Sequence, residues 1–261
     1  MTLIRKPAVA GHFYSGNAGE LRAVVATLLD AAQARNTPAP KALIVPHAGY
    51  IYSGPVAASA YALLQPYRDQ YRRVILLGPC HTVPVHGLAL SSADAFRTPL
   101  GDVPLDKSVI VKLDIPEVQV FDASHKDEHS LEVHLPFLQT VLGNFSVVPI
   151  VVGDAAPELV SQVLDALWGG PETLLVVSSD LSHYLNYANA CAIDAATCHA
   201  IEDLDAGQIN HTGACGATPL AGLLIAAERR DMEVTTLDLR NSGDTAGDKD
   251  TVVGYGAWMF V

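Results

Sequence analysis

Five side chains of types that bind metals or transfer protons occupy comparable places in the sequence. They are His47, His81, Asp180, His183 and Cys215. Imidazole and thiolate groups bind zinc, iron and copper well, and a carboxylate extends the choice toward Fe(II). An aspartate three residues before a histidine can also orient the ring as a proton donor or acceptor. These residue types therefore predict a metal site with an acid–base pair beside it.

The surrounding pattern predicts how these residues are positioned. Residues 42–45, 73–78 and 172–180 are apolar runs rich in branched side chains, which is typical of strands buried on both faces. The histidines and the Asp–His pair stand at the ends of these runs or just after them. Cys215 precedes a glycine at the start of a predicted helix, where the helix dipole favours a thiolate. Since ligands in open α/β sheets bind at the carboxyl ends of strands, we expect these residues at one edge of a sheet.

Apolar runs and helical periodicity alternate along the whole chain. Further strands are predicted at 85–91, 146–153, 234–239 and 252–261, with an edge hairpin at 96–106. Helices are predicted at 18–35, 56–64, 133–142, 157–167, 188–204 and 219–228. No linker longer than a loop interrupts the alternation. The sequence therefore predicts a single α/β domain over residues 1–261, with a mostly parallel or mixed central sheet and helices on both faces.

The composition argues against several classes of function. Of the 261 residues, 49% are hydrophobic and 17% charged, which allows a substantial core. A net charge of −12 without a basic patch argues against nucleic acid or an anionic membrane surface as a partner. No segment resembles a membrane span or a secretory signal. The four cysteines form no Cys-x-x-Cys pair, so neither a disulfide framework nor a zinc ribbon is expected. We expect a soluble cytoplasmic protein.

Each candidate residue also has a simpler interpretation. A single loop histidine more often makes structural hydrogen bonds than it binds a metal. Cys215 by itself is typical of an inert core residue, and Asp180 could cap the turn after its strand. The separations from His47 to His81, on to His183 and then to Cys215 are 34, 102 and 32 residues, and they match no local metal motif. The hypothesis of a site therefore depends on the joint placement of these residues at one sheet edge.

A second polar segment, residues 122–132, leaves its role open. Glu132 follows His129 by three residues, so the two could share a helix face that points either to the site or to solvent. The stretch from His129 to His134 does not match the His-Glu-x-x-His pattern of zinc proteases. The pattern slightly favours a structural interpretation in which Ser130 caps the following helix.

Five motifs in this order resemble those of the Memo family, whose prokaryotic members are called AmmeMemoRadiSam system protein B. They are VPHAGYIYSG at 45–54, LGPCHTVP at 77–84, DEHSLEVHLPF at 127–137, SSDLSH at 178–183 and CGATP at 215–219. Memo proteins are similar in fold to class III extradiol ring-cleaving dioxygenases, which hold non-haem Fe(II) with two histidines and a glutamate. The resemblance covers nearly the whole chain and implies a class III extradiol dioxygenase-like fold.

The resemblance also implies roles for individual residues. It implies His47 and His81 as paired metal ligands, with Cys215 in place of the dioxygenase carboxylate. It implies His183 in the place of the catalytic acid–base histidine, and from the spacing of the pair we predict that Asp180 assists His183 in proton transfer. Tyr52 falls where the family lines its pocket, and Tyr52 and Glu132 are the predicted substrate-binding residues.

A thiolate in place of a carboxylate favours copper or a different iron chemistry, so dioxygenase activity does not follow from the fold. We therefore predict a redox-active non-haem metal enzyme, with Fe(II) as the first choice of metal and Cu or Zn as alternatives. A non-catalytic module that binds a peptide or protein in the same cleft, and a zinc-dependent hydrolase, are the alternative functions. The expected partner is a small molecule or peptide, and the family name suggests AMMECR-type and radical SAM proteins of the same system.

Overall fold

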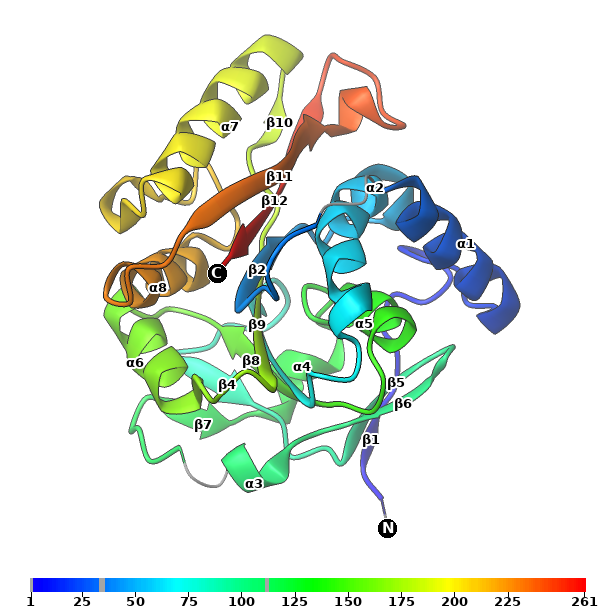
Figure 1. Cartoon of the computed structure of the whole chain (residues 1–261), viewed down its shortest axis with the longest axis vertical. Helices are drawn as coiled ribbons and strands as arrows, with labels where there is room; N and C mark the ends of the chain where they lie inside the picture. The colour runs from blue at the N-terminus through cyan, green and yellow to red at the C-terminus, as the bar shows by residue number, and fades with distance from the viewer. Residues whose placement is uncertain (1, 33–35, 111–112) are drawn as a thin grey trace.

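The computed structural model describes residues 2–32, 36–110 and 113–261, and a mixed sheet lies at its centre (Figure 1). Within these residues the sheet has nine strands. Its middle consists of four parallel strands in the order β2 (Ala42–Val45), β9 (Thr173–Ser178), β3 (Arg73–Pro79) and β8 (Ser146–Val152). Almost every residue of these strands is buried, as their apolar composition predicts. Because the strands are parallel, their carboxyl ends meet at one edge.

Shorter and antiparallel pairings extend this parallel core on both sides. β12 (Val252–Phe260) pairs antiparallel with β2, and both β11 (Val234–Asn241) and β10 (His183–Leu185) pair antiparallel with β12. On the other side β4 (Leu88–Leu90) pairs antiparallel with β8, and β7 (Val118–Val120) pairs parallel with β4. β10 places His183 beside the same sheet edge.

A small second sheet joins the N-terminal arm to the predicted edge hairpin. β1 (Ile4–Arg5) pairs parallel with β5 (Ala95–Thr98), and β5 pairs antiparallel with β6 (Gly101–Pro104). Gly101 has a φ of +128°, which favours glycine at the hairpin turn. The pairing holds Arg5 beside the segment that contains residues 125–134.

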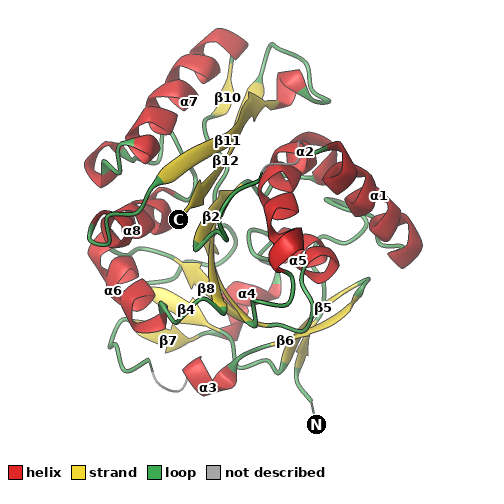
Figure 2. Ribbon diagram, in the orientation of Figure 1, coloured by secondary structure: helices red, strands yellow, loops and turns green. Residues whose placement is uncertain are grey.

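Helices cover both faces of the central sheet (Figure 2). The longer ones are α1 (Ala18–Ala31), α2 (Tyr50–Tyr61) and α5 (Leu135–Val141) on one face, and α6 (Pro157–Leu167), α7 (Tyr187–Glu202) and α8 (Ala217–Glu228) on the other. Short helices are α3 (Lys107–Ile110) and α4 (Asp122–Lys126), with 3-10 turns at Ala62–Tyr67, Glu132–His134, Ala206–Gln208 and Ser242–Asp244. Successive strand residues point to opposite faces of the sheet. Val45 therefore packs in the hydrophobic core under α1, α2 and α5, and Ile44 packs in the core under α6, α7 and α8. The predicted α/β class, with a mixed sheet and helices on both faces, is confirmed.

Two helix boundaries differ from the prediction. α2 begins at Tyr50 and not at residue 56, because Gly49 precedes it and the backbone N–H of Tyr50 donates to the carbonyl of Phe13 at 2.8 Å. Pro55 therefore lies inside α2 and not at its first position. α1 ends at Ala31, and residues 33–35 of the helix predicted at 18–35 lie outside the described residues. No helix in the described part of the chain has the length and apolar character that crossing a bilayer requires.

Candidate metal centre

Three imidazole rings meet beyond the carboxyl ends of β2 and β3. His47 follows β2, His81 follows β3, and His129 lies between α4 and the 3-10 turn Glu132–His134. One ring nitrogen from each lies within 4.8 Å of the others. The ring centroids of His47 and His81 are 5.2 Å apart, and those of His81 and His129 are 4.6 Å apart. Metal–nitrogen bonds of about 2.1 Å require ligand atoms within about 4.2 Å of one another, so small side-chain shifts bring these rings around one ion.

Cys215 adds a sulfur to the same place. Its Sγ lies 3.3 Å from Nε2 of His47, and its backbone N–H donates to the carbonyl of Asp180 at 3.2 Å just before α8. Burial, and then the charge of Asp180, raise the pKa of the Cys215 thiol to about 12. This is opposite to the predicted effect of the helix dipole, because the thiol is desolvated beside a carboxylate. Only a bound cation would deprotonate this thiol near neutral pH.

Glu128 orients the His81 ring and holds the backbone of His129. Its Oε1 accepts a hydrogen bond from Nδ1 of His81 at 2.9 Å and its Oε2 accepts one from the His81 backbone at 2.6 Å. Oε1 also accepts the backbone N–H groups of His129 and Ser130, both at 2.9 Å. Burial alone raises the pKa of Glu128, but the hydrogen bonds and the charge of His81 outweigh it and lower the pKa to about 2. With Nδ1 of His81 donating to a carboxylate, Nε2 keeps its lone pair for a metal.

Glu128 and His129 are the residues that the sequence analysis did not assign to the site. The sequence leaves the role of His129 open and predicts no role for Glu128. The available signal is their position at the start of the motif at 127–137, within the polar segment 122–132. Nothing in the spacing shows which of the adjacent acidic and imidazole side chains turn toward His81.

Asp180 and His183 both lie at this edge, but they do not form the predicted carboxylate–imidazole hydrogen bond. Asp180 Oδ1 accepts the backbone N–H of His47 at 2.7 Å, and Oδ2 lies 3.9 Å from Nε2 of that ring. Nδ1 of His183 donates to the carbonyl of Leu181 at 2.8 Å, so a backbone group and not Asp180 orients the His183 ring. Burial raises the pKa of the Asp180 carboxyl in spite of the hydrogen bond from His47. Asp180 therefore fixes the backbone that presents His47.

The two predicted substrate-binding residues occupy different environments. Tyr52 stands on the first turn of α2 with 39% of its surface exposed. Glu132 is fully buried, and its carboxylate accepts hydrogen bonds from Arg5, from Tyr14 at 2.5 Å and from the backbone of Ala8 and Val9 at 2.7 and 3.0 Å. No oxygen of Glu132 is left for a substrate, which corrects its predicted role. The carboxylate instead ties the N-terminal arm to the core.

A cavity of about 470 Å³ opens beside the centre. His81 and Cys215 both line it. The remaining lining residues lie in the ranges 79–86 and 152–154 and at His211, Thr218 and Pro219. Prolines and valines form much of this wall, so the space beside the metal ligands is partly apolar.

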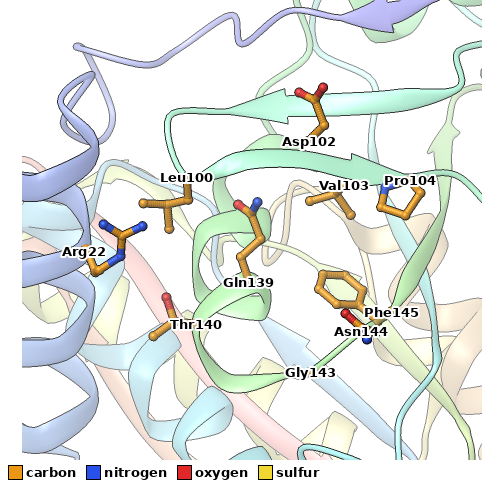
Figure 3. A pocket seen from close by; sticks show the side chains of 10 residues that line it. All are labelled: Arg22, Leu100, Asp102, Val103, Pro104, Gln139, Thr140, Gly143, Asn144 and Phe145. Atoms are coloured by element: carbon orange, nitrogen blue, oxygen red, sulfur yellow. The ribbon is translucent and has the colours of Figure 1, made fainter. Parts of the chain in front are cut away.

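Another cavity, of about 530 Å³, shares no lining residue with the first (Figure 3). It lies between Arg22 of α1, the hairpin turn around Leu100, and Gln139 of α5. The described residues that line it include no histidine or cysteine. The Gln139 amide is already paired with Thr98 and with the Gly101 carbonyl, at 2.6 and 3.2 Å. This cavity therefore offers no ligand set for a transition metal.

Comparisons with known proteins decide the family. Residues 5–259 match the family described as Memo-like protein. The chain belongs to the Memo family. It is 37% identical to a MEMO1 family protein of Methanococcoides burtonii, over 97% of this chain and 98% of the relative. It is 36% identical to a MEMO1 family protein of Aquifex aeolicus, over 99% of both chains.

Among solved structures, this Memo family chain is similar to the uncharacterized protein JW3007 from Escherichia coli K12. The TM-score is 0.50 with 16% sequence identity, and the match covers 82% of this chain and 98% of that one. At this identity the likeness concerns the fold alone. The predicted Memo family and the predicted mixed α/β fold with helices on both faces are confirmed.

Proposed function

We propose that this Memo family protein binds a transition metal and is a redox-active non-haem metal enzyme. The observation that carries the proposal is the convergence of the His47 and His81 rings with the Cys215 sulfur beside an open cavity. Two imidazoles and a thiol suit iron, copper or zinc. Fe(II) is our first choice, and Cu or Zn are the alternatives.

The surrounding residues supply the remaining roles. When bound, the metal provides a centre that exchanges electrons with a substrate held in the cavity. Glu128 orients His81, and Asp180 fixes the backbone of His47. His183 has Nδ1 committed to the Leu181 carbonyl, so its Nε2 is the atom that gives or takes a proton. Tyr52, exposed at the start of α2, contacts the substrate.

The proposal extends to the setting of the protein. We infer a small molecule or a peptide as substrate, a cytoplasmic location, and AMMECR-type and radical SAM proteins as partners in the same system. A zinc hydrolase would need the same ligands without redox chemistry, and a binding module would hold its ligand without any metal. Metal analysis of anaerobically purified protein, followed by assays of each metal form, distinguishes these functions.

The direct test is titration of the metal-free protein with Co²⁺ under anaerobic conditions. His47→Ala and His81→Ala should each weaken binding about ten-fold or more, which corresponds to about 1.4 kcal/mol. Cys215→Ser should weaken binding and abolish the sulfur-to-cobalt charge-transfer absorption. Cys80→Ser is the matched control, because Cys80 lines the same cavity but its thiol donates to the Val83 carbonyl at 2.5 Å. A parent-like spectrum in Cys215→Ser would reject the thiolate ligand. Weaker Co²⁺ binding in His129→Ala would then identify His129 as the third donor.

A further inference from the structure

Four buried side chains form a continuous hydrogen-bonded chain that leads from His47 into the core. The Tyr61 hydroxyl lies 2.8 Å from Nδ1 of His134, and Nε2 of His134 lies 2.8 Å from Oγ of Ser178. The same Oγ lies 2.6 Å from Nδ1 of His47 and 2.6 Å from the carbonyl oxygen of Ser130. All four side chains are at most 2% exposed. None of the contacts that define the metal centre uses Tyr61, His134 or Ser178.

Counting hydrogens assigns a proton position to each link. A carbonyl oxygen can only accept, so the single hydrogen of Ser178 is donated to Ser130. The Ser178 oxygen then has only lone pairs for the two rings, and each ring must donate to it. A neutral imidazole has one N–H, so His47 carries it on Nδ1 and His134 carries it on Nε2. Nδ1 of His134 is thereby left to accept the hydrogen of Tyr61.

The other neutral tautomer of His134 leaves buried groups without partners. If His134 donated from Nδ1 to Tyr61, its Nε2 would have to accept the hydrogen bond from the Ser178 hydroxyl. The Ser130 carbonyl would then lose that donor, and the buried Tyr61 hydroxyl would have no acceptor in this chain of contacts. An unpaired buried polar group costs about 1–3 kcal/mol, so two of them exclude this arrangement. Burial also lowers the pKa of His134 to about 3, which keeps its ring neutral.

We propose that Ser178, His134 and Tyr61 are positioning residues that lock His47 in the Nδ1–H tautomer. The lone pair of Nε2 then faces Cys215 Sγ at 3.3 Å, where a cation would replace the thiol hydrogen. Glu128 fixes the tautomer of His81 in the same way, with a charged acceptor. The His47 tautomer is instead fixed by the neutral series Ser178, His134 and Tyr61, which we call the relay. The effect of the His47 tautomer on metal affinity rests on the proposed metal-binding function. The tautomers themselves exist without a metal.

The first experiment measures the tautomers in the metal-free parent protein by ¹⁵N NMR of the histidine rings. We expect a protonated Nδ1 and an unprotonated Nε2 for His47, and the reverse for His134. His134 protonated at Nδ1, or His47 protonated at Nε2, would overturn the relay. Because this measurement needs no variant and no metal, its outcome is independent of whether the protein is a metalloenzyme.

The second experiment titrates Co²⁺ into Ser178→Ala, which removes the shared acceptor and frees His47 to adopt the other tautomer. Binding should weaken about ten- to hundred-fold, the usual cost of losing a hydrogen-bond partner of a metal ligand. Ser182→Ala is the matched control, because Ser182 is equally buried four residues along the chain but its hydroxyl lies outside the relay. Parent-like affinity in Ser178→Ala would overturn the proposal.

A pair of substitutions at His134 separates the relay from simple packing. His134→Gln keeps an N–H for Ser178 and an oxygen for Tyr61, so it should retain Co²⁺ affinity within about three-fold of the parent. His134→Leu fills similar space without either group and should weaken binding as Ser178→Ala does. Equal affinities for the Gln and Leu variants would overturn the relay. Confirmed tautomers together with a parent protein that binds no Co²⁺ would refute the proposed function and the relay's role in it, and leave only the tautomer assignment.

Discussion

Two buried polar clusters lie at opposite ends of one short segment, and they differ in how fully their polar atoms are used. At one end, Glu128 and His129 belong to the metal centre, where ring nitrogens and a thiol face a cavity. At the other end is a cluster that we call the anchor, in which Glu132 meets Arg5, Tyr14 and the backbone of residues 8 and 9. Glu128 and Glu132 are only four positions apart in the sequence.

The difference shows that burial of a charged group does not by itself indicate a binding site. The Glu132 carboxylate is saturated by partners within the chain, which makes it a structural tie. Arg5 also donates to the carbonyls of His125 and Glu128, at 2.9 and 2.6 Å, so the anchor holds the segment that orients the metal centre. The metal centre, in contrast, keeps a lone pair on Nε2 of His47 that faces the Cys215 thiol, and the hydrogen-bond partner of His81 is on its other ring nitrogen.

The largest effect is expected at the anchor. Glu132→Ala leaves the Arg5 guanidinium and the Tyr14 hydroxyl buried without their acceptor, so the free energy of unfolding should fall by about 3–5 kcal/mol in urea titrations. The control is Asp102→Ala, which breaks the exposed Arg97–Asp102 pair and should cost less than about 1 kcal/mol. Equal losses for the two variants, or a Glu132→Ala protein of parent stability that no longer binds Co²⁺, would contradict the assignment of Glu132 to the anchor.

An intermediate effect concerns acid stability near the anchor. Burial lowers the pKa of His125 to about 4, from an ordinary value of 6.5. Between these values the unfolded chain binds a proton that the folded chain does not, so stability is unaffected above pH 6.5 and falls as the pH drops toward 4. The loss attributable to His125 is on the order of 1–3 kcal/mol, at up to about 1.4 kcal/mol per pH unit.

The measurement is urea unfolding of the parent and of His125→Gln at pH 7.5, 6.5, 5.5 and 4.5. The variant should show a shallower fall in the free energy of unfolding below pH 6.5, because it cannot bind that proton. His86→Gln serves as the control, since the His86 side chain is 91% exposed, and it should follow the parent curve. An unchanged slope in His125→Gln would show that the other buried histidines account for the acid sensitivity.

The smallest effect is expected at Tyr184, next to His183 in β10. Tyr184 follows His183, lies where the β10–β12 register shifts, and has a φ of +57° with 76% of its surface exposed. Since a left-handed conformation strains a residue with a side chain, Tyr184→Gly should raise the free energy of unfolding by about 0.5–1 kcal/mol. Asp231→Gly, at a φ of +51° on the exposed surface after α8, should give a similar gain. A gain for Asp231→Gly but a loss for Tyr184→Gly would mean that the Tyr184 side chain stabilises the fold, for instance through its ring contact with His183.

The sequence alone determined the strands and the chemistry that follows them. Apolar runs at 42–45, 73–78 and 172–180 are long enough and uniform enough to be buried strands in any α/β arrangement, and they correspond to β2, β3 and β9. The positions of His47 and His81 follow directly, because the carboxyl ends of parallel strands lie at one edge. Five ordered motifs were enough to predict the family and its fold.

Only the tertiary structure decided which polar groups meet. Residues 127–134 form an irregular loop and a 3-10 turn, so neither helical nor strand periodicity predicts that Glu128 turns to His81 while Glu132 turns to Arg5. The relay through Ser178 and His134 likewise joins residues 44 positions apart, with its acceptor on the Ser130 carbonyl. The direction in which a side chain points at such positions is set by long-range hydrogen bonds and by the exclusion of water. The local sequence encodes neither of them.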